Sequence, residues 1–436
     1  MFAGGAIRLQ LPVVPFKIGY NLSPKLGPKD NRQRLGHEGV GLISVVFWLL
    51  LATVVGATCY SVIALYAAFL FENTRPPGTY SFTPPVSLIK PLCGAERELE
   101  RNLESFCRQD YPSYEIVFSV REEGDGAVPI VRRLQRNFPY LPIRLLITGP
   151  PRYLNAKVHG MEEMMKAADH EILVISDSDM RVGQDYLRAV VAPMADPAVG
   201  MVTCLSRGAP GRSVWSLLES LGMNTQFFPG VLSAWLLTGM RFALGPTMVI
   251  RKQQVNEIGR FGRLGDYLAD DFVLGELIAK AGYEVAFSEV IPDHLIGGET
   301  ARDSLRHRLR WERSSRCSRP AGYFGQIFTH SLPLALLAWA FSPSGYRFVT
   351  VLVVLCLAAR ALVAWKVGWG LLRDPTLKKY WWLLPVQDVL SFGIWCWAFA
   401  GDEIVWRGAR FRVLKGGKLE PITVVSEKGT PARVRE

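Results

Sequence analysis

The stretch that most constrains the fold of this chain is a short apolar run that ends in two carboxylates. Residues 171–182 read EILVISDSDMRV, and residues 172–175 carry branched apolar side chains. Such a run is typical of a strand that is buried on both faces, inside a sheet covered by helices. The run stops at Asp177 and Asp179, so both carboxylates lie at the end of one buried strand and face a shared cavity.

Two like charges this close together cost free energy unless a cation lies between them or the site is open to water. Oxygen ligands suit Mg²⁺ or Mn²⁺, which bind one or two carboxylates together with substrate phosphates. Asp177 and Asp179 are therefore candidate ligands of a metal–diphosphate site. The alternative is a polar turn after a strand, because Asp and Ser are ordinary turn residues.

Composition indicates a soluble domain combined with membrane segments. The chain has 436 residues, of which 49% are hydrophobic, which is too apolar for an ordinary soluble domain. Its net charge of +11 suits nucleic acid, an anionic membrane surface or a phosphate-bearing ligand. The seven cysteines include no CxxC pair, which argues against a disulfide framework or a zinc site and fits a reducing cytosol.

The N-terminal part predicts a membrane anchor. Residues 40–71 carry no charge, which is ample for a tilted transmembrane helix, and we assign the anchor to residues 39–71. The basic, Pro- and Gly-containing residues 1–38 are expected to be disordered. The last residues, 401–436, are expected to form a basic tail.

The C-terminal part predicts a membrane region over residues 324–400, in three apolar segments at about 324–346, 348–372 and 380–400. Arg360 lies inside the second segment and Asp388 inside the third. Because charges at membrane depth usually pair, we expect these two side chains to approach each other. The alternative is that Arg360 and Lys366 mark a helix that lies in the membrane interface.

Between the apolar segments, strands alternate with helices. Besides the central run, strands are predicted at residues 86–90, 115–120, 143–147 and 200–204, and helices at 99–108, 128–138 and 156–168. Repeated βα units imply an α/β domain with a parallel or mostly parallel sheet, here over residues 86–320. Ligands of such sheets bind at the carboxyl ends of the strands. Asp177, Asp179, Glu122 and Asp125 all follow strands in this way.

Two further stretches carry candidate functional groups. Asp270 and Asp271 lie at the start of a helix predicted near residues 268–277, where capping accounts for one carboxylate and leaves the other for chemistry. Residues 213–239 are apolar, with Glu219 as their single charge. They form either a buried core helix or a helix that lies in the membrane interface, where a hydrophobic substrate would enter the site.

An arginine-rich stretch precedes the C-terminal apolar segments. A positive-inside signal explains most of its arginines and places this end of the domain in the cytoplasm, but it does not explain a Trp beside one of them. The stretch contains Trp311 and seven arginines: Arg302, Arg306, Arg308, Arg310, Arg313, Arg316 and Arg319.

Taken in order, these motifs resemble those of the GT-A glycosyltransferases of the ceramide glucosyltransferase family. The resemblance runs from about residue 86 to beyond Trp311. The sequence is similar in particular to the bacterial hopanoid branch of this family, which transfers N-acetylglucosamine to bacteriohopanetetrol. In that branch, as at His307 here, a His takes the first place of the RxxRW signature. The ordered set comprises a KPLCG strand, carboxylates after the second strand, Asn155-x-Lys157, DSD, ADD, and His307-x-x-Arg310-Trp311.

The resemblance implies a role for each matching residue. It implies that Asp177 and Asp179 hold a metal on the UDP diphosphate and that Asp271 is the general base. The longer Glu122 replaces the family's usual Asp at the nucleotide contact. The remaining substrate-binding candidates are Asp125, Asn155, Lys157 and Asp270, and the remaining catalytic candidates are His307, Arg310 and Trp311.

For two of these residues an ordinary structural role is open as well. Lys157 contacts phosphate or is a solvated lysine on a helix. Trp311 packs against the sugar or the acceptor, or belongs to the core.

The implied reaction is an inverting transfer of glucose or N-acetylglucosamine from a UDP-sugar to a lipid hydroxyl, on ceramide or a hopanoid polyol. Mg²⁺ or Mn²⁺ and Arg310 would neutralise the leaving group. The expected location is the inner (cytoplasmic) membrane, with the catalytic domain in the cytoplasm. The partners are then a UDP-sugar, a lipid and the membrane, with no role for nucleic acid.

Three other functions are weighed against this one. A processive polysaccharide synthase shares the DxD and RW motifs but needs a channel, against which the few apolar segments argue. An NAD-binding oxidoreductase needs a GxGxxG turn after the first strand, where only one glycine occurs. A basic receptor or nucleic-acid-binding protein is disfavoured because the arginines cluster beside apolar segments without an aromatic platform for bases.

Overall fold

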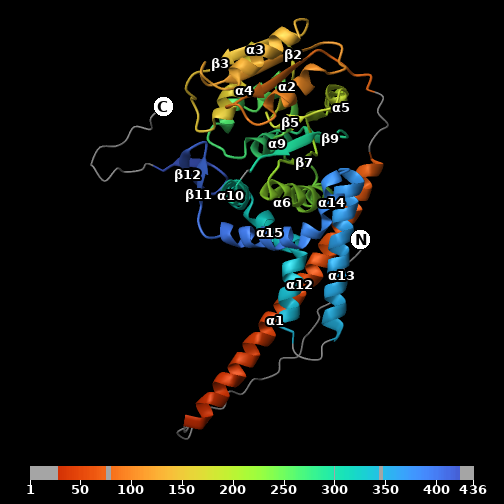
Figure 1. Ribbon diagram of the computed structural model, residues 1–436, viewed down its shortest axis with the longest axis vertical. Helices are drawn as coiled ribbons and strands as arrows, with labels where there is room; N and C mark the ends of the chain where they lie inside the picture. The colour runs from red at the N-terminus through yellow and green to blue at the C-terminus, as the bar shows by residue number, and fades with distance from the viewer. Residues whose placement is uncertain (1–27, 75–79, 299, 343–346, 423–436) are drawn as a thin grey trace, which may run out of the picture. The chain divides into compact units, whose positions relative to one another are not determined.

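The computed structural model describes residues 28–74, 80–298, 300–342 and 347–422 (Figure 1). The chain forms two compact units, Met1–Trp48 and Leu49–Glu436, and the sheets and the candidate site belong to the second unit. The predictions for residues 1–27 and 423–436 fall outside the described residues. Helix α1 (Pro28–Asn73) begins inside the segment expected to be disordered, so that residues 28–38 are helical.

A seven-stranded sheet forms the centre of the second unit, in the order β3-β2-β1-β4-β8-β6-β9. β1, β2, β3 and β4 are parallel, whereas β8 is antiparallel to both of its neighbours. The predicted mostly parallel sheet is therefore confirmed, although β8 and β9 were not predicted. The strands are β1 (Val86–Pro91), β2 (Tyr114–Val120), β3 (Ile143–Ile147), β4 (Ile172–Ser176), β6 (Val199–Cys204), β8 (Thr247–Arg251) and β9 (Glu284–Ser288).

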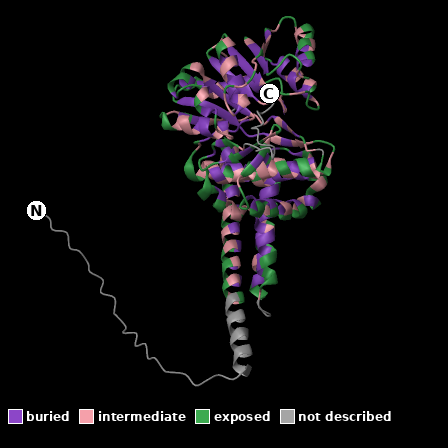
Figure 2. Ribbon diagram, turned by 90° about the vertical axis from the view of Figure 1, so that its left-hand side faces the viewer, coloured by how far each residue is buried: buried purple, intermediate pink, exposed green. Residues whose placement is uncertain are grey.

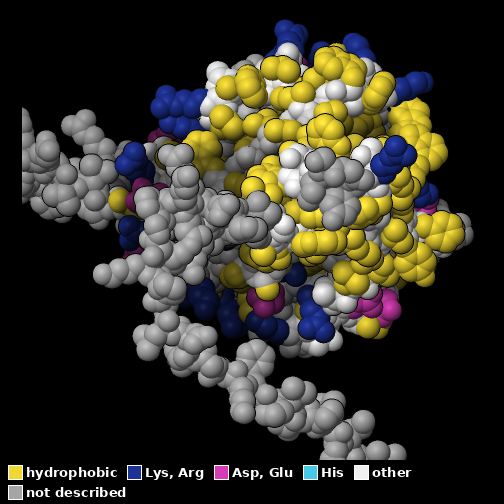
Figure 3. Space-filling model, turned by 90° about the horizontal axis from the view of Figure 1, so that it is seen from below, with side chains coloured by type: hydrophobic (Ala, Val, Ile, Leu, Met, Phe, Trp, Pro, Cys, Tyr) yellow, Lys and Arg dark blue, Asp and Glu magenta, His cyan; other side chains and the backbone are white. Residues whose placement is uncertain are grey.

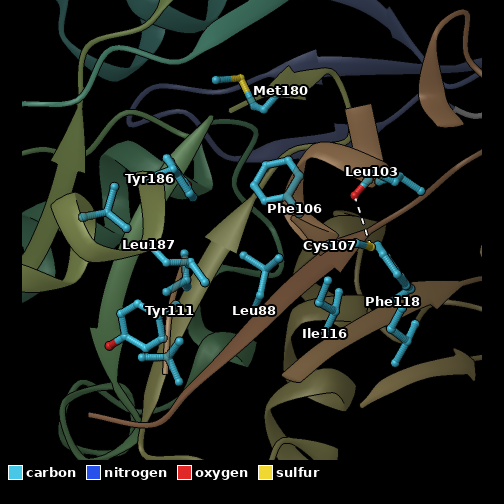
Figure 4. Packing of buried hydrophobic residues seen from close by; sticks show 14 of the residues in the cluster. Leu88, Leu103, Phe106, Cys107, Tyr111, Ile116, Phe118, Met180, Tyr186 and Leu187 are labelled. Carbon is cyan, nitrogen blue, oxygen red and sulfur yellow. Dashed lines mark hydrogen bonds between the residues drawn. The ribbon is translucent and has the colours of Figure 1, made fainter. Parts of the chain in front are cut away.

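The buried strand predicted from the DSD stretch is β4, and all five of its residues are buried. Val174 packs into an apolar cluster on one face of the sheet, whereas Leu173 and Ile175 pack into a second cluster on the other face. This alternation is the period of two that a strand imposes. Figure 4 shows part of the first cluster, in which the rings of Phe106 and Tyr186 meet edge to face at 5.5 Å.

Helices cover both faces of the sheet. The first cluster includes residues of α2, α3 and α5, and the second includes residues of α4, α8 and α9. In Figure 2 buried residues concentrate in this region. The helices of this part are α2 (Leu99–Cys107), α3 (Val128–Asn137), α4 (Ala156–Ala167), α5 (Tyr186–Val191), α6 (Val214–Gly222), α7 (Phe228–Thr238), α8 (Lys252–Glu257), α9 (Asp270–Lys280) and α10 (Ala301–Ser318).

Short 3₁₀ or π segments join several of these helices to their neighbours, and further helices follow α10. The joining segments are η1 (Ala192–Ala195), η2 (Met223–Phe227), η3 (Phe261–Leu264), η4 (Gln326–Thr329), η5 (Ala364–Leu371) and η6 (Trp381–Leu383). The later helices are α11 (Pro320–Gly325), α12 (Ser331–Ala340), α13 (Arg347–Val363), α14 (Pro375–Tyr380) and α15 (Leu384–Ala398).

Two small sheets complete the unit. β10 (Asp293–Ile296) lies between β5 (Met180–Arg181) and β7 (Arg207–Pro210), so that the strand after DSD pairs with a distant strand. The second small sheet contains β11 (Glu403–Trp406), β12 (Ala409–Val413) and β13 (Leu419–Pro421). It occupies part of the predicted basic tail, where charged residues on the exposed faces of short strands obscured the pattern.

Two helices among the described residues are long and apolar enough to span a membrane, Ile43–Asn73 and Arg347–Leu371. The other two predicted segments contain shorter helices, with 10 residues in α12 and 15 in α15, so three C-terminal spans are not confirmed. In Figure 1, α15 runs across the direction of α12 and α13. Seen from below, hydrophobic side chains cover much of the surface (Figure 3).

Arg360 and Asp388 form a buried ion pair, as predicted. Arg360 donates from Nη2 to Oδ1 at 2.7 Å and from Nε to Oδ2 at 3.1 Å, the two-pronged geometry that guanidinium and carboxylate groups favour. Arg360 also donates to the hydroxyl of Thr225 in η2 at 3.2 Å. The pair therefore joins α13 and α15 to the apolar stretch that begins at α6.

Replacing Asp388 by Leu should strongly destabilise the protein, because the guanidinium of Arg360 would stay buried without its counterion. Loss of one partner of a buried pair costs about 3–5 kcal/mol. Unfolding of the purified protein in detergent measures this cost. The double variant Arg360→Met/Asp388→Leu should recover most of the stability, and a single variant as stable as the parent would show that the pair is dispensable.

Candidate active site

Lys90 of β1 holds the turn after β4 through hydrogen bonds to Ser176 and to the backbone of Asp177. Its side chain is fully buried, and Nζ donates to the backbone oxygen of Asp177 at 2.7 Å and to Ser176 Oγ at 3.2 Å. The ammonium also lies 3.5 Å from the centre of the Phe106 ring. Burial lowers the pKa of Lys90 to about 7, against the opposing charges of Asp177 and Asp179. Lys90 belongs to the KPLCG strand, but the sequence reasoning gave it no role.

Four carboxylates gather at this edge of the sheet, and Lys157 of α4 lies among them. We call Asp177, Asp179, Asp270 and Asp271 the carboxylate cluster. Lys157 Nζ lies 2.7 Å from Asp177 Oδ1 and 3.8 Å from Asp270 Oδ2. Although burial lowers the pKa of Lys157, the charges of Asp177 and Asp270 raise it further, so the ammonium stays charged. The alternative of a solvated lysine is therefore wrong.

Asn155 positions Lys157 and Asp270 together. It caps α4, with Oδ1 accepting from the backbone nitrogens of Lys157 at 3.0 Å and Val158 at 3.4 Å. Its Nδ2 donates to Asp270 Oδ1 at 3.2 Å and to the backbone oxygen of Tyr267. Asn155 is thus an internal support of the cluster, and it has no exposed surface.

Asp179 pairs with His294, a residue that the sequence reasoning missed. The register of β5 and β10 places His294 opposite Met180, and its Nε2 lies 3.1 Å from Asp179 Oδ2. Although burial lowers the pKa of His294, the charge of Asp179 raises it above its usual value. Only the pairing of two strands distant in sequence brings these groups together.

The DxD pair fits a divalent cation. The other carboxylate oxygen of Asp179, Oδ1, is buried and has no hydrogen-bond partner among the described residues, so it is an acceptor ready for a cation. The described residues contain no group of three or more His, Cys, Asp or Glu side chains that could hold a metal by themselves. Two carboxylates that need further ligands from phosphate and water are what Mg²⁺ and Mn²⁺ use.

Asp271 lies in the first turn of α9 and is held by backbone amides. Oδ2 accepts from Gly245 N and Oδ1 from Phe272 N, both at 2.7 Å. A Cβ atom on Gly245 would lie 2.8 Å from Oδ2, so glycine allows this close approach. Burial and the charge of Asp270 raise the pKa of Asp271 to about 6. The expected capping role is wrong, because no side chain caps this helix start and Asp270 binds Asn155 instead.

The acidic residues after β2 lie apart from the carboxylate cluster. Asp125 accepts from Gly94 N at 2.9 and 3.0 Å and from Ala127 N at 2.8 Å, which ties the loop after β1 to the loop after β2. Glu122 is exposed. Within the described part of the chain, neither carboxylate contacts the cluster, so a direct nucleotide contact by either residue stays a prediction.

His307 and Trp311 of α10 pack beside a buried acid. His307 Nδ1 lies 2.6 Å from Glu219 Oε1, and Ser304 donates to Oε2 at 2.8 Å. The rings of His307 and Trp311 lie 4.7 Å apart, and Trp311 is 36% exposed, so it is no core residue. Glu219 is the single charge of residues 213–239, whose helices α6 and α7 are largely buried, as the core alternative expects.

The arginines of α10 do more than mark a membrane boundary. Arg308 donates to Ser391 of α15 at 2.8 Å, and Arg316 donates to the backbone oxygen of Gly401 at 2.7 Å. Arg319, directly after α10, lies over the rings of Phe242 and Phe272. Burial and the charge of Arg407 lower the pKa of Arg310, and the charge of Glu219 opposes them.

Comparison with known proteins identifies relatives. The model of glycosyl transferase family 21 matches residues 49–419. Ceramide glucosyltransferase 1 of Caenorhabditis elegans is 29% identical over 206 residues, which is 47% of this chain and 44% of the relative. Ceramide glucosyltransferase of Komagataella phaffii is 26% identical over 171 residues, or 37% of this chain and 32% of the relative. The chain thus matches less than half the length of these curated relatives.

Solved structures with similar chains include a mannosyltransferase and TarS. The mannosyltransferase PcManGT from Pyrobaculum calidifontis, in complex with GDP-Man and Mn²⁺, has a TM-score of 0.49 and 20% identity, and covers 82% of this chain and 99% of its own. S. aureus TarS 1–349 in complex with UDP-GlcNAc has a TM-score of 0.36 and 16% identity, and covers 78% of this chain and 100% of its own.

Replacing Lys157 by Met should lower the free energy of unfolding by roughly 1–3 kcal/mol, because the buried carboxylate of Asp270 and the partly buried carboxylate of Asp177 lose their cation. The matched control is Lys166→Met on the same helix, where an exposed ion pair with Glu163 is worth less than about 1 kcal/mol. Thermal unfolding with and without Mn²⁺ checks both. Mn²⁺ should stabilise the Lys157 variant more than the parent protein, since it replaces the lost charge. Equal behaviour of the two variants would contradict this.

Proposed function

Because this chain belongs to glycosyl transferase family 21, we propose that it transfers a hexose from a UDP-sugar to the hydroxyl group of a membrane lipid. The observation that carries this proposal is the partly buried carboxylate of Asp271, which is held by two backbone amides. Its pKa of about 6 suits a base near neutral pH, and it lies beside a carboxylate pair suited to a metal-bound diphosphate.

On the donor side, the proposal gives the DxD pair to the diphosphate. Asp177 and Asp179 would hold Mg²⁺ or Mn²⁺, which supplies positive charge to the leaving phosphate oxygens. Lys157, already charged and in contact with Asp177, would add a second cation beside the same oxygens. Lys90 keeps the turn in place through the backbone of Asp177. Asn155 and Asp270 would hold Lys157 in position through the hydrogen bond between them and would not touch the sugar.

On the acceptor side, Asp271 would take the proton of the lipid hydroxyl. The hydroxyl oxygen forms a bond to the anomeric carbon while the bond from that carbon to the diphosphate oxygen breaks, and its electron pair leaves with UDP. One base and no covalent sugar–enzyme intermediate predict inversion at the anomeric carbon. The two backbone amides that hold Asp271 fix its direction before the acceptor arrives.

The α10 residues would complete the site. Arg310 would bind the leaving diphosphate, because its guanidinium group can donate paired hydrogen bonds to phosphate oxygens. The partly exposed ring of Trp311, packed against His307 and near Phe227, offers an apolar face to the sugar or the acceptor. Glu219 fixes the orientation of His307 through Nδ1. His307 in this position is also the feature that favours a hopanoid polyol over ceramide as acceptor.

The acceptor is proposed to come from the membrane. The two long apolar helices belong to the same chain as the site, and several exposed tryptophans lie around α13 and α15, as expected at a lipid–water boundary. We place the protein in the inner membrane with the site facing the cytoplasm. The acceptor is then a hopanoid polyol or ceramide, and the sugar N-acetylglucosamine or glucose. A processive polysaccharide synthase remains the alternative, since it uses the same motifs.

Sugar transfer to lipid tests the function directly. Purified protein in detergent, with Mn²⁺ or Mg²⁺, should move label from UDP-N-acetylglucosamine or UDP-glucose into bacteriohopanetetrol or ceramide. Asp271→Asn should lower the rate roughly hundredfold or more. Label in a long polymer instead of a lipid would favour the polysaccharide synthase. No binding of any UDP-sugar would overturn the glycosyltransferase proposal.

The rate should depend on pH through Asp271. The base acts in its ionised form, and its pKa is raised to about 6, so activity should be full above pH 7 and fall about tenfold for each pH unit well below 6. Measuring kcat/KM from pH 5 to 8 checks this, with unfolding followed in parallel to exclude acid denaturation. A rate that is flat across this range would argue against Asp271 as the base.

A further inference from the structure

The small sheet β11–β13 is attached to the loop that leads into the carboxylate cluster. Leu419 N donates to the backbone oxygen of Asp266 at 2.7 Å, and Leu268 N donates to that of Gly417 at 3.2 Å. Tyr267 and Lys418 form a β-bridge between these contacts. Because Asp270 follows this loop within a few residues, the C-terminal sheet is fixed to the segment that positions it.

The same sheet is also attached to α10. Arg313 donates to the backbone oxygens of Glu403 and, at 3.2 Å, of Ala400, and Gly416 N donates to that of Cys317 at 2.9 Å. Cys317 packs with apolar residues of all three strands. Arg310 precedes Arg313 by three residues and so lies one turn away on the same side of the helix. The sheet therefore bridges α10 and the loop before α9.

The turn between β11 and β12 presents an arginine in an unfavourable backbone conformation. Trp406 pairs with Ala409, so Arg407 and Gly408 form a two-residue hairpin turn, with φ of +49° and +81°. Such turns favour Asn or Gly at the first position, because other side chains clash in the left-handed region. A strained residue of this kind is a reason to look for function in its side chain.

The side chain of Arg407 packs against its neighbour Trp406, and its charge acts on a second cation, because it lowers the pKa of Arg310. The guanidinium carbon of Arg407 lies 5.7 Å from the centre of the Trp406 ring, which is itself packed against the core of the small sheet. Neither Arg407 nor Arg310 has an ion pair or hydrogen bond with another described residue. Two like charges without a counterion repel each other, which costs free energy. An anion bound between them would offset this repulsion.

Charge effects link this pair of arginines to the DxD turn. Desolvation and the charges of Asp179 and Asp177 raise the pKa of Glu96, against the opposing charge of Arg407. Glu96 in turn accepts from the hydroxyl of Ser178, the middle residue of the DxD motif, at 3.0 Å. The charge of Arg407, at the tip of the hairpin, therefore acts on a residue that is hydrogen-bonded to the DxD turn, to which the proposed function assigns the diphosphate.

We propose that Arg407, carried by the C-terminal hairpin, is a diphosphate-binding residue that holds the nucleotide diphosphate together with Arg310. The inference rests on the proposed function and deepens it. A guanidinium group offers paired donors that match phosphate oxygens. Two guanidinium groups on separate elements, those of Arg310 and Arg407, would bind the diphosphate from two directions. The strained turn is retained because it aims the guanidinium, and the bridge from α10 to the loop before α9 keeps it there.

The test is binding of UDP and UMP, with Mn²⁺ and without acceptor, to the full-length protein in detergent by calorimetry. In the variant Arg407→Asn, UDP should bind roughly tenfold more weakly or worse, whereas UMP, which lacks the second phosphate, should lose less. Asn is favoured in this turn, so the unfolding temperature should stay equal or rise. The matched control is Arg410→Gln, which removes one charge from an exposed position on the same hairpin and should leave UDP binding unchanged.

Each other outcome is informative. Unchanged UDP binding in Arg407→Asn overturns the inference and leaves the proposed function intact. Equal weakening in Arg407→Asn and Arg410→Gln also overturns it, since it would indicate a general charge effect and not a contact. A lower unfolding temperature in Arg407→Asn would contradict the argument from the strained turn. Failure of the parent protein to bind UDP would instead overturn the proposed function itself.

Discussion

The ammonium group of Lys157 allows the carboxylate cluster to exist. It lies between Asp177, at the end of a central strand, and Asp270, at the start of α9, and so neutralises charges that two distant parts of the chain bring together. Asn155 supports it by capping its helix and binding Asp270. Without this cation, the carboxylates at this edge of the sheet, which are buried or partly buried, would lose the positive charge that offsets their mutual repulsion. The site is therefore organised in advance of any ligand.

Positive charge in this protein has three separate uses. Lys90 and Lys157 sit inside the cluster, one behind the DxD turn and one between its carboxylates. Several arginines of α10 bind backbone oxygens or side chains of the C-terminal segments and thus join catalytic and apolar parts of the chain. Arg310 and Arg407 have no ion pair or hydrogen bond with another described residue, and these are the two arginines that we assign to the diphosphate. The net charge of +11 alone distinguishes none of these uses.

The buried pair of Arg360 and Asp388 shows how the apolar helices are tied to the site. It joins α13 and α15, and through Thr225 it reaches the stretch that contains Glu219. Glu219 in turn binds His307, one helical turn before Trp311. The stretch that contains Thr225 and Glu219 is therefore held by polar contacts to the apolar helices at one residue and to α10 at the other. This arrangement suits an enzyme that takes its acceptor from a lipid phase, as proposed here.

Local sequence pattern was enough to predict the buried strand of the DSD stretch, the mostly parallel sheet, the acidic start of α9 and the approach of Arg360 to Asp388. The first three follow from burial and periodicity, which act on residues close together in the sequence. The last follows from the cost of a lone charge among apolar segments, where each charge has few possible counterions. Tertiary structure decided what depends on contacts distant in sequence. The pairing of Asp179 with His294 follows from the register of β5 and β10, and the charged state of Lys157 from its two carboxylates. The position of Arg407 follows from a sheet in what read as a basic tail, since short strands with charged faces carry almost no signal of their own.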